Sequence, residues 1–238
     1  MLELKNINFS AGGQNILKDL SLKISTGKFI AITGPNGSGK STIAKIIMGI
    51  EKPNNGQILF NGIDITNTSI TERAKLGISF GFQAPVQFKG LTVLDLLNLS
   101  AGKKLDYSEA RSYLYKVGLC GSKYLNREVD SSLSGGELKR VEIANVLARN
   151  AKLSIFDEPE AGIDLWSFNN LIQVFNDMRA EYKGSIIVIS HQERILNIAD
   201  EIVLIQDGSV NKKVRTSKDL DNASGLACCC QLKKGETA

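Results

Sequence analysis

The stretch Gly34-Pro-Asn-Gly-Ser-Gly-Lys40-Ser41 decides how the rest of this sequence is interpreted. It matches the pattern G-x-x-x-x-G-K-[ST], and it follows the short apolar run Phe29–Thr33. After it comes the segment Ser41–Ile50, whose isoleucines recur at helical spacing. A strand, a glycine-rich turn and a helix in this order predict a loop that binds phosphate groups.

The residues of this loop have separate expected roles. Glycines let backbone N–H groups turn toward phosphate oxygens, and the helix N-terminus adds the positive end of its dipole. The Lys40 ammonium is expected to neutralise the β- and γ-phosphates of ATP, and the Ser41 hydroxyl to bind Mg²⁺. The expected nucleotide-binding residues are Gly34, Pro35, Asn36, Gly37, Ser38, Gly39, Lys40, Ser41 and Thr42. The alternative, a glycine-rich turn with an unrelated lysine, needs a chance match on the order of one in a hundred.

A second apolar strand, Leu153–Phe156, ends in the adjacent acids Asp157 and Glu158. Folds of the α/β class bind ligands at the carboxyl ends of their strands, so both carboxylates are expected near the loop. Asp157 is expected to hold Mg²⁺, directly or through water. Successive residues point in different directions, so Glu158 is expected to orient or deprotonate the attacking water. The alternative is an ordinary solvated strand end.

Strands alternate with helices along most of the chain, which predicts an α/β fold with a mainly parallel sheet. The alternating residues Leu20, Leu22 and Ile24 predict an antiparallel edge beside that sheet. A long helix is expected after Asp164, capped by its carboxylate, and a turn at Asp207-Gly208.

The organisation is expected to be a single domain over residues 1–216, followed by a polar tail, 217–238. The segment 84–132 offers helices at 92–99 and 108–117 and no convincing buried strand. It is therefore expected to form a helical sub-domain, with the catalytic core built from 1–83 and 133–216.

Composition excludes several classes of protein. The chain has 238 residues with 42% hydrophobic and 23% charged residues and a net charge of +4, which is mild for a nucleic-acid-binding protein. No stretch reaches the roughly 18 apolar residues of a membrane span, and the N-terminus lacks the apolar core of a signal peptide. The sequence therefore predicts a cytoplasmic protein that binds no nucleic acid and has no direct membrane insertion. A short basic run near the C-terminus is interpreted as a solvated tail: Lys212, Lys213, Arg215 and Lys218.

The four cysteines do not form a disulfide framework, because three of them are consecutive, at 228–230. A flexible reduced tail is the simplest interpretation, and transient handling of a metal or persulfide is the alternative. Cys120 is interpreted as a packing residue.

Further motifs indicate a family. Leu133-Ser-Gly-Gly-Glu137 resembles the signature motif of the ABC ATPases, and it lies between the phosphate loop and the acidic strand, as in that family. Gln83 resembles the family's Q-loop glutamine, Ala161-Gly-Ile-Asp164 resembles its D-loop, and His191 resembles its switch histidine. The chain is therefore identified as a member of the ABC ATPases, P-loop NTPases with an inserted helical sub-domain.

The resemblance implies how the motifs work together. The signature residues Ser134, Gly135 and Gly136 would serve the ATP of a second cassette, so the chain is expected to form a homodimer on ATP binding. A Ser-Gly-Gly turn at a helix start is also a chemically suitable anion site. The resemblance further implies that Asp164 lies at the shared nucleotide.

The resemblance assigns the remaining site residues too. Gln83 would sense Mg²⁺ and the γ-phosphate, and His191 would contact the γ-phosphate and orient Glu158. A lone histidine is otherwise more often a structural residue. The family's adenine-stacking aromatic residue is replaced by Ala11, so phosphate contacts are expected to dominate nucleotide affinity.

Within that family, several stretches resemble the SufC group, the soluble ATPases of the Suf iron–sulfur cluster assembly system. They are Phe82–Val86, Gly90–Val93, Gly135–Ile143 and Glu160–Asp164. The resemblance implies that ATP-driven pairing reshapes a SufB/SufD-type scaffold protein docked near residues 83–90. There Val86, Phe88 and Leu91 form a docking surface or merely pack the sub-domain.

Other functions remain open. The main alternative is an ATP-binding subunit of an ABC membrane transporter, whose partner would dock at the same place. ATPases of the DNA-repair or ribosome type carry long coiled-coil insertions or tandem cassettes, which this sequence does not contain.

Overall fold

The computed structural model describes residues 1–84, 86–181, 184–216 and 219. Among them, the larger sheet has six strands in the order β12-β11-β3-β10-β9-β6, and only β12 runs antiparallel to its neighbour. Its strands are β3 (Phe29–Thr33), β6 (Ile78–Gly81), β9 (Leu153–Asp157), β10 (Ser185–Ile189), β11 (Glu201–Gln206) and β12 (Ser209–Val214). Every residue of β3, β9 and β10 is buried, as expected for parallel strands covered on both faces.

The N-terminal segment forms an antiparallel sheet of its own beside the parallel one, in the order β2-β1-β4-β5. Its strands are β1 (Leu2–Ala11), β2 (Gln14–Ile24), β4 (Asn55–Phe60) and β5 (Ile63–Asp64). Leu20, Leu22 and Ile24 are buried while the residues between them are exposed, so the predicted half-buried strand is confirmed. The antiparallel strand at the edge of the large sheet is instead β12, joined to β11 by the predicted turn at Asp207-Gly208.

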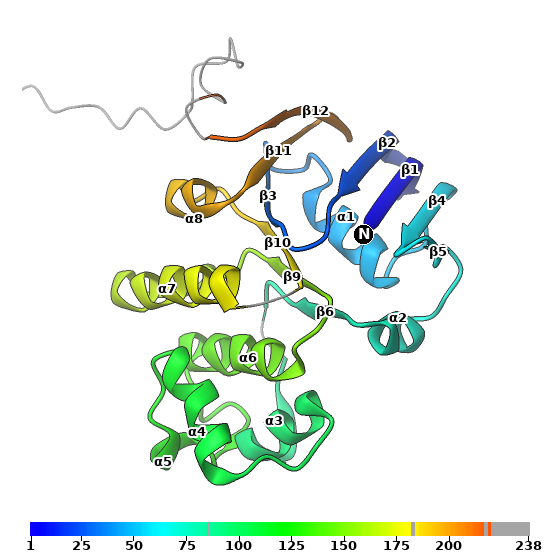
Figure 1. Ribbon diagram of the computed structural model, residues 1–238. Coiled ribbons are helices and arrows are strands. Elements are labelled where there is room, and N and C mark those ends of the chain that lie inside the picture. Colours follow the sequence, from blue (N-terminus) through cyan, green and yellow to red (C-terminus); the bar gives the residue numbers. More distant parts are fainter. Residues whose placement is uncertain (85, 182–183, 217–218, 220–238) are drawn as a thin grey trace, which may run out of the picture.

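Helix α1 (Lys40–Met48) lies between the antiparallel sheet and one face of the parallel sheet (Figure 1). Its isoleucines are buried in the core that these three elements share. The carboxyl end of α1 meets α2 (Ile70–Leu76), where the buried Arg73 donates hydrogen bonds to the carbonyl oxygens of Ile46 and Ile47 at 2.6 and 2.9 Å. The sequence analysis predicts neither α2 nor the short strand β6.

The other face of the parallel sheet packs against helices that share one apolar core with it, among them α6 (Gly135–Arg149), α7 (Leu165–Glu181) and α8 (Glu193–Ile198). Three further helices, α3 (Val93–Ala101), α4 (Tyr107–Lys116) and α5 (Gly121–Tyr124), extend this core on the side of α6 that faces away from the sheet. The two helices expected within 84–132 are confirmed as α3 and α4, and each begins with a capping box. In Figure 1, α3, α4 and α5 lie beside α6 at the end of the molecule away from β11 and β12.

The segment 84–132 also contains two short strands that the sequence analysis does not predict. It contains a short antiparallel pair, β7 (Phe88–Thr92) with β8 (Glu128–Val129), and the side chain of Val129 is buried. The pairing joins residues about forty positions apart in the chain, so no local pattern indicates it. The boundaries of the sub-domain stay a prediction.

Two further expectations are not tested. Helix α7 begins directly after Asp164, as expected, but capping by its carboxylate stays a prediction. The tail from 217 to 238, with Lys218 and the cysteines 228–230, lies outside the described residues except for Asp219. Within the described part of the chain, the structure has no helix long and apolar enough to cross a membrane.

Candidate nucleotide-binding site

The glycine-rich loop lies between β3 and α1, as predicted, and two of its glycines are required by close contacts. Gly34 has a φ of 143°, and a Cβ there would lie 2.0 Å from the carbonyl oxygen of Ile205 in β11. Gly39 has a φ of 98°, and a Cβ there would lie 2.6 Å from the side chain of Leu17 in β2. The loop therefore passes so close to β11 and β2 that any side chain at these positions would displace it.

Lys40 is buried and reaches back across the loop. Its Nζ donates hydrogen bonds to the carbonyl oxygens of Gly34 and Pro35 at 2.8 and 2.9 Å. Desolvation lowers the pKa of this ammonium, and the charges of Glu158 and Asp157 raise it. The loop thus surrounds a positive charge that lies near the two acids.

The loop also fits a phosphate in a second way. The hydroxyl oxygen of Ser38 is buried and has no hydrogen-bond partner among the described residues. A buried polar group without a partner costs about 1–3 kcal/mol. A phosphate oxygen would accept this hydrogen bond, so the residues present suit a nucleotide triphosphate.

Two of the residues expected to hold Mg²⁺ are in contact. The Ser41 hydroxyl, at the start of α1, donates to Oδ1 of Asp157, at the end of β9, at 3.0 Å. Burial raises the pKa of the Asp157 carboxyl, the bond from Ser41 lowers it, and the charge of Glu158 raises it further. A hydroxyl and a carboxylate oxygen at this spacing are the hard ligands that Mg²⁺ prefers, so the residues fit the ion.

Gln83, the third residue expected to bind Mg²⁺, contacts Glu158. Its Nε2 donates to Oε2 of Glu158 at 2.6 Å. Glu158 has a φ of 44°, which is unusual for a residue other than glycine. Its backbone N–H donates to the carbonyl of Ile189 at 3.0 Å, which fixes the ends of β9 and β10 together.

His191 follows β10 directly, where the sequence places it. Desolvation lowers the pKa of its imidazole, the charge of Lys40 lowers it further, and Glu158 raises it. Lys40, Glu158 and His191 are therefore close enough for their charges to interact. A lowered pKa favours the neutral imidazole at neutral pH, and a neutral imidazole can accept a hydrogen bond.

The signature residues occupy the exposed start of α6. Ser134 caps the helix: its hydroxyl accepts from the N–H of Glu137 at 3.3 Å, and Glu137 accepts from the N–H of Ser134 at 2.7 Å. Hydrogen bonds from the Tyr124 hydroxyl and then from Ser134 lower the pKa of Glu137 to about 2. The charge of Glu137 therefore persists near the helix N-terminus, while Ser134 and Gly135 face solvent.

The D-loop lies beside the signature turn. A Cβ at Gly136 would lie 3.7 Å from the carbonyl oxygen of Gly162, and Asp164 is exposed. At the start of this loop, Glu160 accepts a hydrogen bond from the Ser190 hydroxyl at 2.5 Å, directly before His191. Burial raises the pKa of Glu160, and its other carboxylate oxygen has no partner among the described residues.

Sequence reasoning missed three charged residues near the site that the fold removes from solvent: Lys139 on α6 is buried, and Glu142 on α6 and Glu160 are half-buried. Glu142 and Glu160 have apolar residues on both sides in the sequence, but an exposed residue next to a core position shows the same pattern. The helical spacing of Lys139 and Glu142 indicates an ion pair, but it does not show that the pair is buried.

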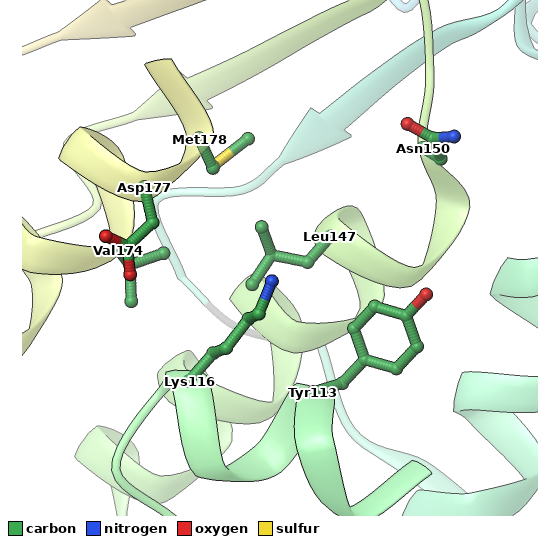
Figure 2. A pocket seen from close by; sticks show the side chains of 7 residues that line it. All are labelled: Tyr113, Lys116, Leu147, Asn150, Val174, Asp177 and Met178. Carbon is green, nitrogen blue, oxygen red and sulfur yellow. The ribbon is translucent and has the colours of Figure 1, made fainter. Parts of the chain in front are cut away.

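One cavity in the described part of the chain lies away from these residues. It has a volume of about 190 Å³ and lies between α4, α6 and α7 (Figure 2). Leu147, Val174 and Met178 give it apolar walls, and Tyr113, Lys116, Asn150 and Asp177 give it polar ones. None of the expected site residues lines it.

Comparisons with known proteins agree with the site. A family model described as ABC transporter matches residues 17–161, which include the loop and the acidic strand end. An uncharacterised ABC transporter ATP-binding protein of Methanocaldococcus jannaschii, MJ0035, is 40% identical over 221 residues, covering 89% of this chain and 88% of that protein. The probable ATP-dependent transporter ycf16 of Antithamnion sp. is 36% identical over 226 residues, covering 88% and 89%.

A solved structure shows the same fold. The dimeric structure of a post-hydrolysis state of the ATP-binding cassette MJ0796, bound to ADP and Pi, has a TM-score of 0.80 and 27% identity. The similarity covers 90% of this chain and 98% of that chain.

Proposed function

Because this chain belongs to the ABC transporter ATPase family and is an ATPase that uses ATP with Mg²⁺, we propose that two copies pair around ATP to drive a shape change in a bound protein. We further propose that this protein is a scaffold of the SufB/SufD type, so that the chain serves iron–sulfur cluster assembly in the cytoplasm as a SufC-like ATPase. The stretches that resemble SufC support this choice.

The pairing is supported by the exposed signature turn. Ser134 and Gly135 face solvent at the start of α6, so they are free to meet the γ-phosphate held by a second copy. Backbone N–H groups at a helix start bind anions well. Gly136 and Asp164 would complete this contact, since the D-loop lies beside the signature turn.

The proposed chemistry uses residues that the structure already brings together. When bound, Mg²⁺ would neutralise and orient the β- and γ-phosphates of ATP. Ser41 and Asp157 would hold the ion, and Lys40 would exchange its loop carbonyls for phosphate oxygens. Glu158 would take the proton of the attacking water, with Gln83 and His191 fixing its carboxylate.

The proposal that a partner protein docks on this chain is supported by the exposure of apolar side chains beside the Q-loop. Val86 and Phe88 are 45% and 43% exposed, whereas Leu91 packs on the core. Exposed apolar side chains close to Gln83 are typical of an interaction surface. They would let a partner act on the residue that contacts Glu158.

Membrane transport is the second candidate, and the names of the relatives favour it. Both curated relatives described above are named as transporter proteins, and transporter partners would be membrane proteins. Affinity purification from native cells distinguishes the two, because a water-soluble SufB/SufD-type protein supports the first and a polytopic membrane protein the second.

A matched pair of variants tests the surface itself. Phe88→Asp should lose the captured partner and keep the ATPase activity of the purified protein, because Phe88 lies outside the nucleotide site. Leu99→Asp is the control, since Leu99 is 67% exposed on α3 in the same segment and should keep the partner. Equal capture by both variants would place the docking surface elsewhere.

The pairing has its own test. Ser134→Arg adds a bulky charged side chain where the second copy would meet the γ-phosphate, so it should abolish ATP turnover while leaving ATP binding by its own loop intact. Normal turnover by this variant would rule out the shared site.

A further inference from the structure

A buried ion pair on α6 lies directly behind the Q-loop. The Nζ of Lys139 is 3.1 Å from Oε2 of Glu142, one turn along the helix, and the side chain of Lys139 is 2% exposed. Burial raises the pKa of Glu142, and the charge of Lys139 opposes this. Burying two charges is unfavourable unless each charged group also makes further hydrogen bonds. The other hydrogen-bond partners of Lys139 and Glu142 therefore indicate the role of the pair.

Those partners are backbone groups of two adjacent residues, Phe82 and Gln83. Oε1 of Glu142 accepts from the N–H of Phe82 at 2.7 Å, and the Lys139 ammonium donates to the carbonyl oxygen of Phe82. The ammonium is also 3.4 Å from the carbonyl oxygen of Gln83. Strand β6 ends at Gly81, so the ion pair holds the chain at the point where the sheet no longer does.

The next contact leads to the proposed base. The side chain of Gln83 donates to Glu158 at 2.6 Å. The glutamine side chain reaches that carboxylate from the stretch of backbone that the ion pair contacts. The same helix begins at Ser134, the residue proposed to meet the ATP of a second copy.

We propose that Lys139 and Glu142 are positioning residues for ATP hydrolysis, which hold the Q-loop so that Gln83 orients Glu158. They transmit any movement of the first turn of α6 to the base of the same chain. The inference rests on the roles proposed above for Gln83 and Glu158. Lys139 also lowers the pKa of Asp157, although burial raises that pKa more strongly, so the test must separate positioning from an electrostatic effect on the metal site.

The experiment measures steady-state ATPase kinetics of the purified full chain. Lys139→Met alone would leave the Glu142 carboxylate buried without its opposite charge. The main probe is therefore the double variant Lys139→Met/Glu142→Gln, which removes both charges and keeps the size of both side chains. We expect kcat to fall about tenfold or more, with KM for ATP and the Mg²⁺ concentration for half-activation within about twofold of native values. Lys103→Met is the matched control, because it breaks an exposed lysine–glutamate pair with Glu109 and should leave kcat unchanged.

A double-mutant cycle shows whether the pair acts through Gln83. In a Gln83→Ala background, the Lys139→Met/Glu142→Gln change should cause no further loss of kcat, because the contact it positions is already absent. The proposal would be overturned if the Gln83→Ala loss and the Lys139→Met/Glu142→Gln loss of kcat multiplied when combined. A native kcat for Lys139→Met/Glu142→Gln, or a change in its Mg²⁺ dependence alone, would also overturn it. If the double variant does not fold, Glu142→Gln alone carries the same cycle, since it removes the negative charge that holds the Lys139 ammonium and keeps the size of the side chain.

Discussion

Replacing Gly34 by alanine tests whether β11 holds the phosphate-binding loop in shape. The added Cβ would lie 2.0 Å from the carbonyl oxygen of Ile205, which is backbone and cannot rotate away. The φ of 143° adds a second cost, because residues with a Cβ rarely adopt it. Backbone strain costs about 1–3 kcal/mol, and overpacking costs about 1–3 kcal/mol more. We therefore expect Gly34→Ala to lose about 2–6 kcal/mol of unfolding free energy.

The matched control is Gly37→Ala in the same loop. Gly37 has a φ of 79°, but no described atom lies within 4 Å of the Cβ that alanine would add. This variant carries only the backbone cost of about 1–3 kcal/mol. Urea unfolding of the nucleotide-free proteins measures both values. Equal losses would show that the contact between the loop and β11 does not constrain Gly34.

Three other substitutions test the site and its support. Glu158→Gln should give an ATP-bound dimer that persists on size-exclusion chromatography with ATP and Mg²⁺, because the proposed base is lost while the phosphate contacts remain; a monomer at high protein concentration contradicts this. Asp157→Asn should raise the Tm of the nucleotide-free protein at neutral pH and abolish hydrolysis, because burial raises the pKa of this carboxyl and makes its charge costly in the folded state. That cost is absent below the pKa of the unfolded state and complete above the raised folded pKa, so a Tm gain that persists in acid would point to another cause. Arg73→Met should lower the unfolding free energy by about 3 kcal/mol, since carbonyl oxygens at the end of α1 lose their partner; an unchanged urea midpoint would refute this.

Local patterns were enough for the parts of the fold that the site depends on. The loop at 34–41 is a contiguous motif between two periodic segments, and Asp157 and Glu158 directly follow an apolar run. Their meeting in space follows from the large sheet, because its parallel strands all end at the same edge. The Ser41–Asp157 contact could therefore be expected from sequence.

Pairings between residues far apart in the chain could not be expected from the sequence. Strand β6 has four residues, and β7 pairs with β8 across the whole of α3, α4 and α5, so neither is marked by periodicity. The contact between Gln83 and Glu158 joins residues 75 positions apart. Lys139 carries no sign of burial, because a lysine on a helix usually covers apolar surface with its stem and keeps its charge in water.

The two hydrogen bonds that Lys40 makes within its own loop affect how its variants should be used. Substituting this lysine is an obvious way to make a cassette that cannot bind ATP. Here the same ammonium also ties the Gly34 and Pro35 carbonyls to α1. A Lys40 variant would therefore alter the loop's own geometry as well as its charge, and its failure to bind would not by itself measure what the lysine contributes to gripping a nucleotide.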